Sequence, residues 1–304
     1  MDFEMLFKVI RRLTLFFAVV WISLTLFMST PANLAVTGGF VGPPAPEKVV
    51  FDKTVPLLNC ESAYLFDNST RAKIFGKDEY EIRPIASITK LLSALTFLDF
   101  KVDWNKTIEM TMADVENSSR SVLRAGHVYK VGDLLHASLM GSDNRATRAI
   151  ARSTGIPMDS FVVCMNKKAD ELGLLSISIE EPTGLSENNV ASAADVARLL
   201  NAAANNPTIS SILQMKSYSF SSVNRGRQYT YGNTNKLLSG RWEVEGGKTG
   251  YIDEAGWCFV ARVNDRQGHD LTAVVLGANS NSQRFRQAQK MFDWAFGQLE
   301  RNRF

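Results

Sequence analysis

Hydrophobic and polar residues alternate in some stretches of the chain and follow a helical repeat in others. Residues 62–67 alternate as a strand does, and residues 71–76 return as a second strand after the turn at 68–70. Beyond Pro84 the spacing changes to three and four residues, which predicts a helix from about Ser87 that is buried along one side. The apolar positions of that helix are Ile88, Leu91, Leu92, Leu95 and Leu98.

Helical spacing continues through the middle of the chain and gives way to strands near the end. We expect helices at residues 132–139, 145–152, 159–172 and 193–204. Strands are expected at residues 243–248, 256–263 and 271–276, the last two joined as a hairpin by the turn at 264–268. Strands at both ends with helices between them predict an α+β fold. A helical lobe of about residues 88–215 is inserted into a lobe formed by an antiparallel sheet.

A final helix is expected from about residue 281. Its apolar face carries Phe285, Ala288, Phe292, Ala295, Phe296 and Leu299. Arg284, Arg286 and Lys290 lie off that face. We interpret the helix as a cover for the sheet. The alternative is an amphipathic foot on a membrane.

The first residues have the layout of a secretory signal peptide. Lys8, Arg11 and Arg12 precede an apolar run at residues 13–28, and the small residues Ala32 and Ala35 follow. We expect residues 1–32 to be a signal peptide, with a retained membrane anchor as the alternative. Residues 33–57 are rich in Pro and Gly and predict a linker, and we expect residues 58–301 to form the folded domain that carries the function. With either N-terminus the protein is exported.

Composition narrows the function only by exclusion. The 304 residues carry a net charge of +3 with no basic run, which argues against a nucleic-acid partner. Cys60, Cys164 and Cys258 are scattered and form no C-x-x-C pair, so we expect no zinc, other metal or cofactor, and any pairing among them stays open.

The candidate chemistry starts at Ser87-Ile88-Thr89-Lys90. The serine is at a helix N-terminus, and the lysine lies one turn along on the same face. A lysine accepts a proton from a hydroxyl only when its amine is neutral. Burial and a second cation both lower a lysine pKa, and we expect Lys248 to be that cation. The chain's three histidines, by contrast, form no nucleophile-elbow or metal-ligand pattern.

A second motif, Ser142-Asp143-Asn144, lies between two expected helices. Ser and Asp are also common helix caps, so the triplet alone is weak evidence of function. Its functional interpretation makes Ser142 a proton relay to a leaving nitrogen. Asn144 then serves as a polar clamp for Lys90 and the substrate amide.

A third motif, Lys248-Thr249-Gly250, ends an expected strand. It is not a phosphate-binding loop, because Trp242 stands where that motif needs a glycine. Lys248 and Thr249 are candidates to hold a substrate carboxylate, and Gly250 lets the substrate approach the strand. The N–H of Tyr251, with that of Ser87, is the expected oxyanion site.

The three motifs in this order resemble those of the low-molecular-mass penicillin-binding proteins, the serine D-alanyl-D-alanine peptidases. Longer segments carry the resemblance from about Cys60 to Leu299. They are Pro84-Ile85-Ala86-Ser87-Ile88-Thr89-Lys90, Glu181-Pro182-Thr183-Gly184-Leu185-Ser186, Asn233-Thr234-Asn235-Lys236-Leu237 and Gly247-Lys248-Thr249-Gly250. The endopeptidase subgroup, whose members also stop soon after the sheet, is the most similar.

The resemblance implies a β-lactamase/DD-peptidase-like fold, with a five-stranded antiparallel sheet flanked by helices. It also implies that Ser87 is acylated, by peptidoglycan peptides or by β-lactam antibiotics as inhibitors, with Lys90 as base and Ser142 as relay. Asn144, Lys248 and Thr249 bind substrate. The expected location is the periplasm or the outer face of the inner membrane, with other cell-wall enzymes as further candidate partners.

Two alternatives stay open. A class A-like β-lactamase shares the triplets, but no Glu-x-x-Leu-Asn segment is present to supply that class's water-activating glutamate. A penicillin-binding scaffold with little catalysis is the other, and the intact Ser87 and Lys90 weigh against it. The balance of carboxypeptidase and endopeptidase activity is not predicted.

Overall fold

A computed structural model describes residues 55–116, 121–265 and 267–301 of the chain. The expected signal peptide and nearly all of the expected linker lie outside these residues. None of the described helices is long and apolar enough to cross a membrane. The domain boundaries drawn from the sequence therefore stay a prediction.

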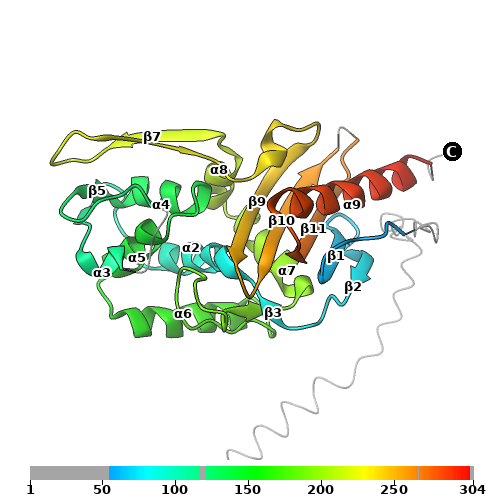
Figure 1. Cartoon of the computed structure of the whole chain (residues 1–304), viewed down its shortest axis with the longest axis horizontal. Coiled ribbons are helices and arrows are strands. Elements are labelled where there is room, and N and C mark those ends of the chain that lie inside the picture. The colour runs from blue at the N-terminus through cyan, green and yellow to red at the C-terminus, as the bar shows by residue number, and fades with distance from the viewer. Residues whose placement is uncertain (1–54, 117–120, 266, 302–304) are drawn as a thin grey trace, which may run out of the picture. The chain divides into compact units, whose positions relative to one another are not determined.

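A five-stranded antiparallel sheet in the order β2-β1-β11-β10-β9 is the framework of the described chain (Figure 1). Its strands are β1 (Ser62–Asp67), β2 (Ala72–Lys77), β9 (Glu243–Ile252), β10 (Gly256–Asn264) and β11 (Asp270–Ala278). The first two and the last three strands in the sequence thus meet in one sheet. The predicted α+β class and antiparallel sheet are confirmed.

The sheet is buried on both faces, and its side chains alternate between two cores. On β11, Leu271, Ala273 and Val275 face one core, while Val274 and Leu276 face the other. Helix α9 (Asn281–Arg301) covers the first of these faces. The apolar residues expected to cover the sheet, from Phe285 to Leu299, are buried in that core. The sheet-cover interpretation of this helix therefore holds.

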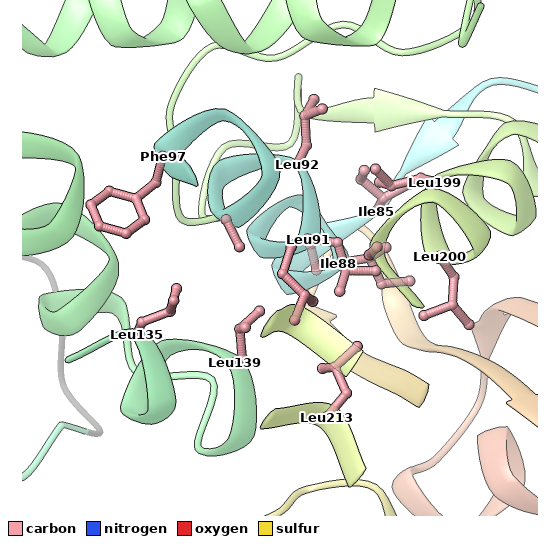
Figure 2. Close-up of a cluster of buried hydrophobic side chains, with 14 of the residues drawn as sticks. Ile85, Ile88, Leu91, Leu92, Phe97, Leu135, Leu139, Leu199, Leu200 and Leu213 are labelled. Carbon is pink, nitrogen blue, oxygen red and sulfur yellow. The ribbon is translucent and has the colours of Figure 1, made fainter. Parts of the chain in front are cut away.

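The helices of the middle segment lie on the side of the opposite face. They are η1 (Ala86–Ile88), α2 (Thr89–Asp99), α3 (Met112–Val115), α4 (Val131–Met140), α5 (Asn144–Ser153), α6 (Met158–Glu171), α7 (Ala193–Asn205) and α8 (Pro207–Gln214). Of these, η1, α7 and α8 contact the sheet directly, and α2 packs on α6 and α7. In Figure 2, Ile88 of η1 and Leu91 of α2 lie among Leu139, Leu200 and Leu213, which come from α4, α7 and α8.

Short strand pairs complete the described chain. β3 (Arg83–Pro84) pairs with β6 (Val190–Ala191), β4 (Thr107–Glu109) with β5 (Val128–Lys130), and β7 (Ser217–Ser221) with β8 (Gln228–Gly232). η2 (Lys236–Ser239) precedes β9. The β7–β8 hairpin, which the sequence did not predict, lies alongside α4 and extends toward β5 (Figure 1).

Candidate active site

Ser87 lies in η1, a tight turn wedged between edge strand β9 and the loop at residues 181–189. Ala86 just before it has a left-handed φ of 47°, which is strained for a residue with a Cβ. Gly184 packs so closely that a side chain there would collide with the Ala86 carbonyl. A Cβ on Gly250 would lie 2.8 Å from the Ile85 carbonyl oxygen. These two glycines let the neighbouring segments close on the turn that holds Ser87.

Lys90 is fully buried one turn beyond Ser87, at the start of α2. Its Nζ lies 2.9 Å from Ser87 Oγ, 2.6 Å from Asn144 Oδ1 and 2.5 Å from the Thr183 carbonyl oxygen. A neutral amine has two protons and one lone pair. Asn144 Oδ1 and the Thr183 oxygen can only accept hydrogen bonds, so each accepts one from an N–H of the amine. The lone pair is then left facing the Ser87 hydroxyl.

Burial is the main cause that lowers the pKa of Lys90 to about 7, with a smaller lowering by Arg148, and Glu181 and Asp143 oppose the shift. From the sequence, Lys248 was expected to cause part of this shift. Instead, the repulsion between the two amines is felt at Lys248, whose pKa is lowered by burial first and by Lys90 and Arg284 after that. Two buried amines in one site hold their protons weakly.

Ser142 occupies the sharp connection between α4 and α5, with a left-handed φ of 59°. Asp143 is the N-cap of α5 and accepts from the N–H of Ala146, so the motif is a helix cap as well as a part of the site. The same carboxylate accepts from Ser121 Oγ at 2.6 Å and from Tyr231 Oη on β8 at 2.7 Å. These bonds tie the strained connection to two neighbouring segments.

Lys248 is buried in strand β9, with 1% of its surface exposed. Its Nζ donates to Ser142 Oγ at 2.7 Å, so an amine and a hydroxyl face each other across the site. The hydroxyl of Thr249 donates to Thr234 Oγ1 at 2.8 Å.

A cavity of about 760 Å³ opens over these groups. Apart from Lys90 and Lys248, all of the residues predicted for the site line this cavity, namely Ser87, Ser142, Asn144, Thr249, Gly250 and Tyr251. The two lysines lie beneath the lining and reach it through Ser87 and Ser142. The structure thus brings all eight predicted residues into one site.

Arg284 is a residue that the sequence argument missed. It was expected on the polar side of α9 but is 7% exposed and lines the cavity. Its Nη1 donates to the Gly250 carbonyl oxygen at 2.9 Å, and Trp257 and Phe285 flank the guanidinium. Nε has no hydrogen-bond partner among the described residues. The sequence did contain one indication of this burial, because Arg284 directly precedes Phe285 of the apolar face.

A serine beside a buried lysine, with a second serine–lysine pair facing it, on a sheet covered by helices, is the arrangement that active-site serine DD-peptidases share with class A β-lactamases. The model of the D-alanyl-D-alanine carboxypeptidase family matches residues 50–280, and the chain belongs to that family.

Curated relatives have two kinds of name. A D-alanyl-D-alanine endopeptidase of Pseudomonas aeruginosa is 32% identical over 89% of this chain and 86% of its own length. A D-alanyl-D-alanine carboxypeptidase of Bacillus subtilis is 30% identical over 79% of this chain and 63% of its own length. The chain is therefore a serine D-alanyl-D-alanine peptidase, and these names leave its subtype open.

Solved structures agree with the family. The Streptomyces K15 DD-transpeptidase matches with a TM-score of 0.75 at 25% identity, over 80% of this chain and 99% of that one. A D-alanyl-D-alanine carboxypeptidase of Mycobacterium tuberculosis matches with a TM-score of 0.73 at 29% identity, over 82% and 96%. The expected resemblance and fold are confirmed.

Proposed function

We propose that this chain cleaves the D-alanyl-D-alanine bonds of peptidoglycan stem peptides through an acyl-enzyme on Ser87. The observation that carries the proposal is the set of contacts around Lys90. Asn144 Oδ1 and the Thr183 carbonyl oxygen accept hydrogen bonds from the two N–H groups of the neutral amine. Its lone pair therefore points toward Ser87 Oγ. This is the geometry that a general base for a serine nucleophile needs.

Acylation begins when Ser87 Oγ attacks the carbonyl carbon of the penultimate D-alanine. The hydroxyl proton passes to Lys90 as the new C–O bond forms. The carbonyl oxygen becomes an oxyanion, for which the backbone N–H groups of Ser87 and Tyr251 are the candidate donors. Both residues line the cavity.

Collapse of the tetrahedral intermediate breaks the C–N bond and needs a proton on the leaving nitrogen. Ser142 supplies it and takes one in turn from the Lys248 ammonium, 2.7 Å away. Lys90 now carries the proton from Ser87, so the site as a whole has lost one proton to the departing amine. Water then attacks the ester carbon: its oxygen and one hydrogen become part of the product carboxyl group, and its other proton stays in the site. As the Ser87 C–O bond breaks, Lys90 gives its proton to Ser87 Oγ, and the proton from the water restores the Lys248 ammonium.

The substrate carboxylate binds between Lys248, Thr249 and Arg284. Arg284 is a buried cation with an unpartnered Nε at the cavity wall, which suits an anionic group. A carboxylate bound there favours the charged form of Lys248. The Lys248 ammonium in turn repels a second positive charge and so favours the neutral form of Lys90. Substrate binding thus places the base in the protonation state that acylation requires.

Both peptidase subtypes use this chemistry and differ in the leaving group. Free D-alanine leaves in the carboxypeptidase reaction, and the side-chain amine of a neighbouring peptide leaves in the endopeptidase reaction. We favour endopeptidase activity alongside carboxypeptidase activity. The segments that resemble the endopeptidase subgroup support this preference, as does the endopeptidase named in Pseudomonas aeruginosa. The expected export signal puts the enzyme in the periplasm, where cutting cross-links would affect cell shape.

The test is a direct comparison of two substrates. Purified protein is given a cross-linked muropeptide dimer and an uncross-linked pentapeptide, and monomer release and free D-alanine are measured side by side. Ser87→Ala is the control. Identical products from wild type and Ser87→Ala would overturn the proposal in favour of a scaffold. Rapid, sustained hydrolysis of a chromogenic cephalosporin would favour the β-lactamase alternative.

A further inference from the structure

A carboxylate outside the cavity holds the loop that supports Lys90. Glu181 Oε2 accepts from the N–H of Thr183 at 2.8 Å and from its hydroxyl at 2.5 Å. Glu181 Oε1 accepts from the N–H of Leu185 at 2.6 Å and from Asn189 Nδ2 at 3.2 Å. The N–H of Ser186 also donates to Oε1, at 3.4 Å, so five donors from one short loop converge on a single side chain.

The same loop is fastened to α2 on either side of Lys90. One residue before it, Thr89 Oγ1 accepts from Asn189 Nδ2 at 3.3 Å, and three residues after it, Ser93 Oγ donates to the Pro182 carbonyl at 2.6 Å. Between these anchors, the Thr183 carbonyl oxygen accepts a hydrogen bond from Lys90 Nζ. Glu181, which provides the carboxylate, is only two residues before Thr183, whose carbonyl accepts from Lys90.

We propose that Glu181 is a positioning residue for Lys90, which fixes the Thr183 carbonyl against the amine and supplies the negative charge that keeps this buried base strong. The inference rests on the proposed function, in which Lys90 is the base. Of the described residues in this loop, Leu185 lines the cavity and Glu181 does not. Glu181 acts through the loop and not on the substrate.

The charges around Lys90 show what Glu181 contributes. Asp143 faces the amine from the α4–α5 connection, Arg148 faces it from α5, and Lys248 faces it from β9. Burial and Arg148 lower the pKa of Lys90, and Glu181 is the largest influence that raises it. Without that charge the amine would be neutral at lower pH, but it would also be a weaker base. The two consequences have opposite effects on rate, which makes the role measurable.

Glu181→Gln is the test variant, and Glu180→Gln is its matched control. Glu180 is exposed, carries the same charge one residue earlier, and bonds to Ser186 and Asn188 but not to Thr183. The readout is the second-order rate of Ser87 acylation by a fluorescent penicillin, measured from pH 5 to pH 10. For Glu181→Gln we expect the acid limb to move about 0.5–1 pH unit lower, while the plateau rate falls about tenfold. Glu180→Gln should match wild type in both.

A merely structural role would lower the plateau without moving the acid limb. Thr183→Val tests this separately, because it removes one bond to Glu181 and keeps the charge. For it we expect a lower plateau with the acid limb at the wild-type pH. The inference is overturned if the limb of Glu181→Gln stays in place, or if Glu180→Gln shifts it equally.

Two further outcomes are decisive. If Glu181→Gln does not fold, Glu181→Asp takes its place, because it draws the charge back by one methylene; an unmoved acid limb in that variant overturns the inference. If wild type is not acylated, or Ser87→Ala is labelled as strongly, it is the proposed function that fails. The wild-type and Ser87→Ala arms therefore separate the two failures.

Discussion

At the scale of single residues, the site depends on two amines that the fold takes out of water. An isolated ammonium is costly to bury, and Lys90 and Lys248 are both fully enclosed. Each has acceptors for its protons, Asn144 and Thr183 for one and Ser142 for the other. Burial next to neutral acceptors therefore produces an amine that is a base near neutral pH, where an exposed lysine would be charged.

The pH dependence of acylation follows from Lys90. Its pKa is lowered to about 7, so below that pH the amine is an ammonium with no lone pair for Ser87. We expect the second-order rate of penicillin acylation to rise through about pH 7. Well below that pH the rate should fall about tenfold for each pH unit. Rapid-quench measurements of labelled protein over pH 5–9 would check this, and a rate that is level across that range would contradict the assignment of Lys90 as base.

Arg284→Gln should weaken binding of substrates that end in a carboxylate. The guanidinium is buried at the cavity wall, and a charge-assisted hydrogen bond is lost with it. We expect KM for the pentapeptide to rise about tenfold or more, with a smaller change in kcat. Arg286→Gln is the control, since Arg286 is exposed two residues along the same helix. Equal losses for a substrate whose C-terminal carboxyl is amidated would contradict carboxylate recognition by Arg284.

At the scale of elements, the β7–β8 hairpin supports the connection that carries Ser142. Tyr231 on β8 donates to Asp143, and Phe220 stacks parallel to the Tyr231 ring, with centroids 6.0 Å apart. Gly141 leaves room for that ring, because a Cβ there would overlap it. The hairpin therefore forms part of the wall of the site.

Tyr231→Phe removes this bond and keeps the ring. We expect kcat to fall several-fold, because Ser142 loses part of its support, and the free energy of unfolding to fall by about 1 kcal/mol. Tyr218→Phe is a matched control on the same hairpin, where the hydroxyl bonds to Asp133 away from the cavity. Turnover and urea denaturation of both variants would check the pair. Equal loss of kcat in the two would mean that the hairpin acts only through overall stability.

Most of the longer periodic elements could be predicted from the sequence, whereas several that are short or directly adjoin another element were missed. Strand β1 begins and ends where its alternation predicted, and helix α4 extends one residue beyond the expected range at each end. The missed strand β7, Ser217–Ser221, does alternate polar and aromatic residues, but over only five positions, and its pattern was overlooked. Helix α8 was missed because Asn206 both ends α7 and caps α8, which left no linker to mark a boundary.

At the scale of the whole described chain, the sheet brings together segments that are distant in the sequence. β9 carries Lys248, and η1 with Ser87 packs directly against it. The alternating pattern predicted the sheet but not this contact. What indicated that residues 87, 142 and 248 meet was the resemblance to a family, since no periodicity reports the distance between two loops. The burial of Arg284 likewise depends on how α9 lies across β9 and β10, which is a tertiary property.

Helix α9 therefore has two duties, closing one core and delivering Arg284, and the last prediction separates them. Phe292 is fully buried between α9 and the sheet, two turns beyond Arg284. Phe292→Ala should lower the free energy of unfolding by about 3–5 kcal/mol, because it leaves a cavity that the sheet cannot close. Acylation measured well below the melting temperature should change less than threefold, since Arg284 is held independently by the Gly250 and Cys258 carbonyls. Lys290→Ala, on the exposed side of the same helix, should alter neither quantity. A large loss of acylation by folded Phe292→Ala would show that the core under α9 sets the position of Arg284, and that the two duties are one.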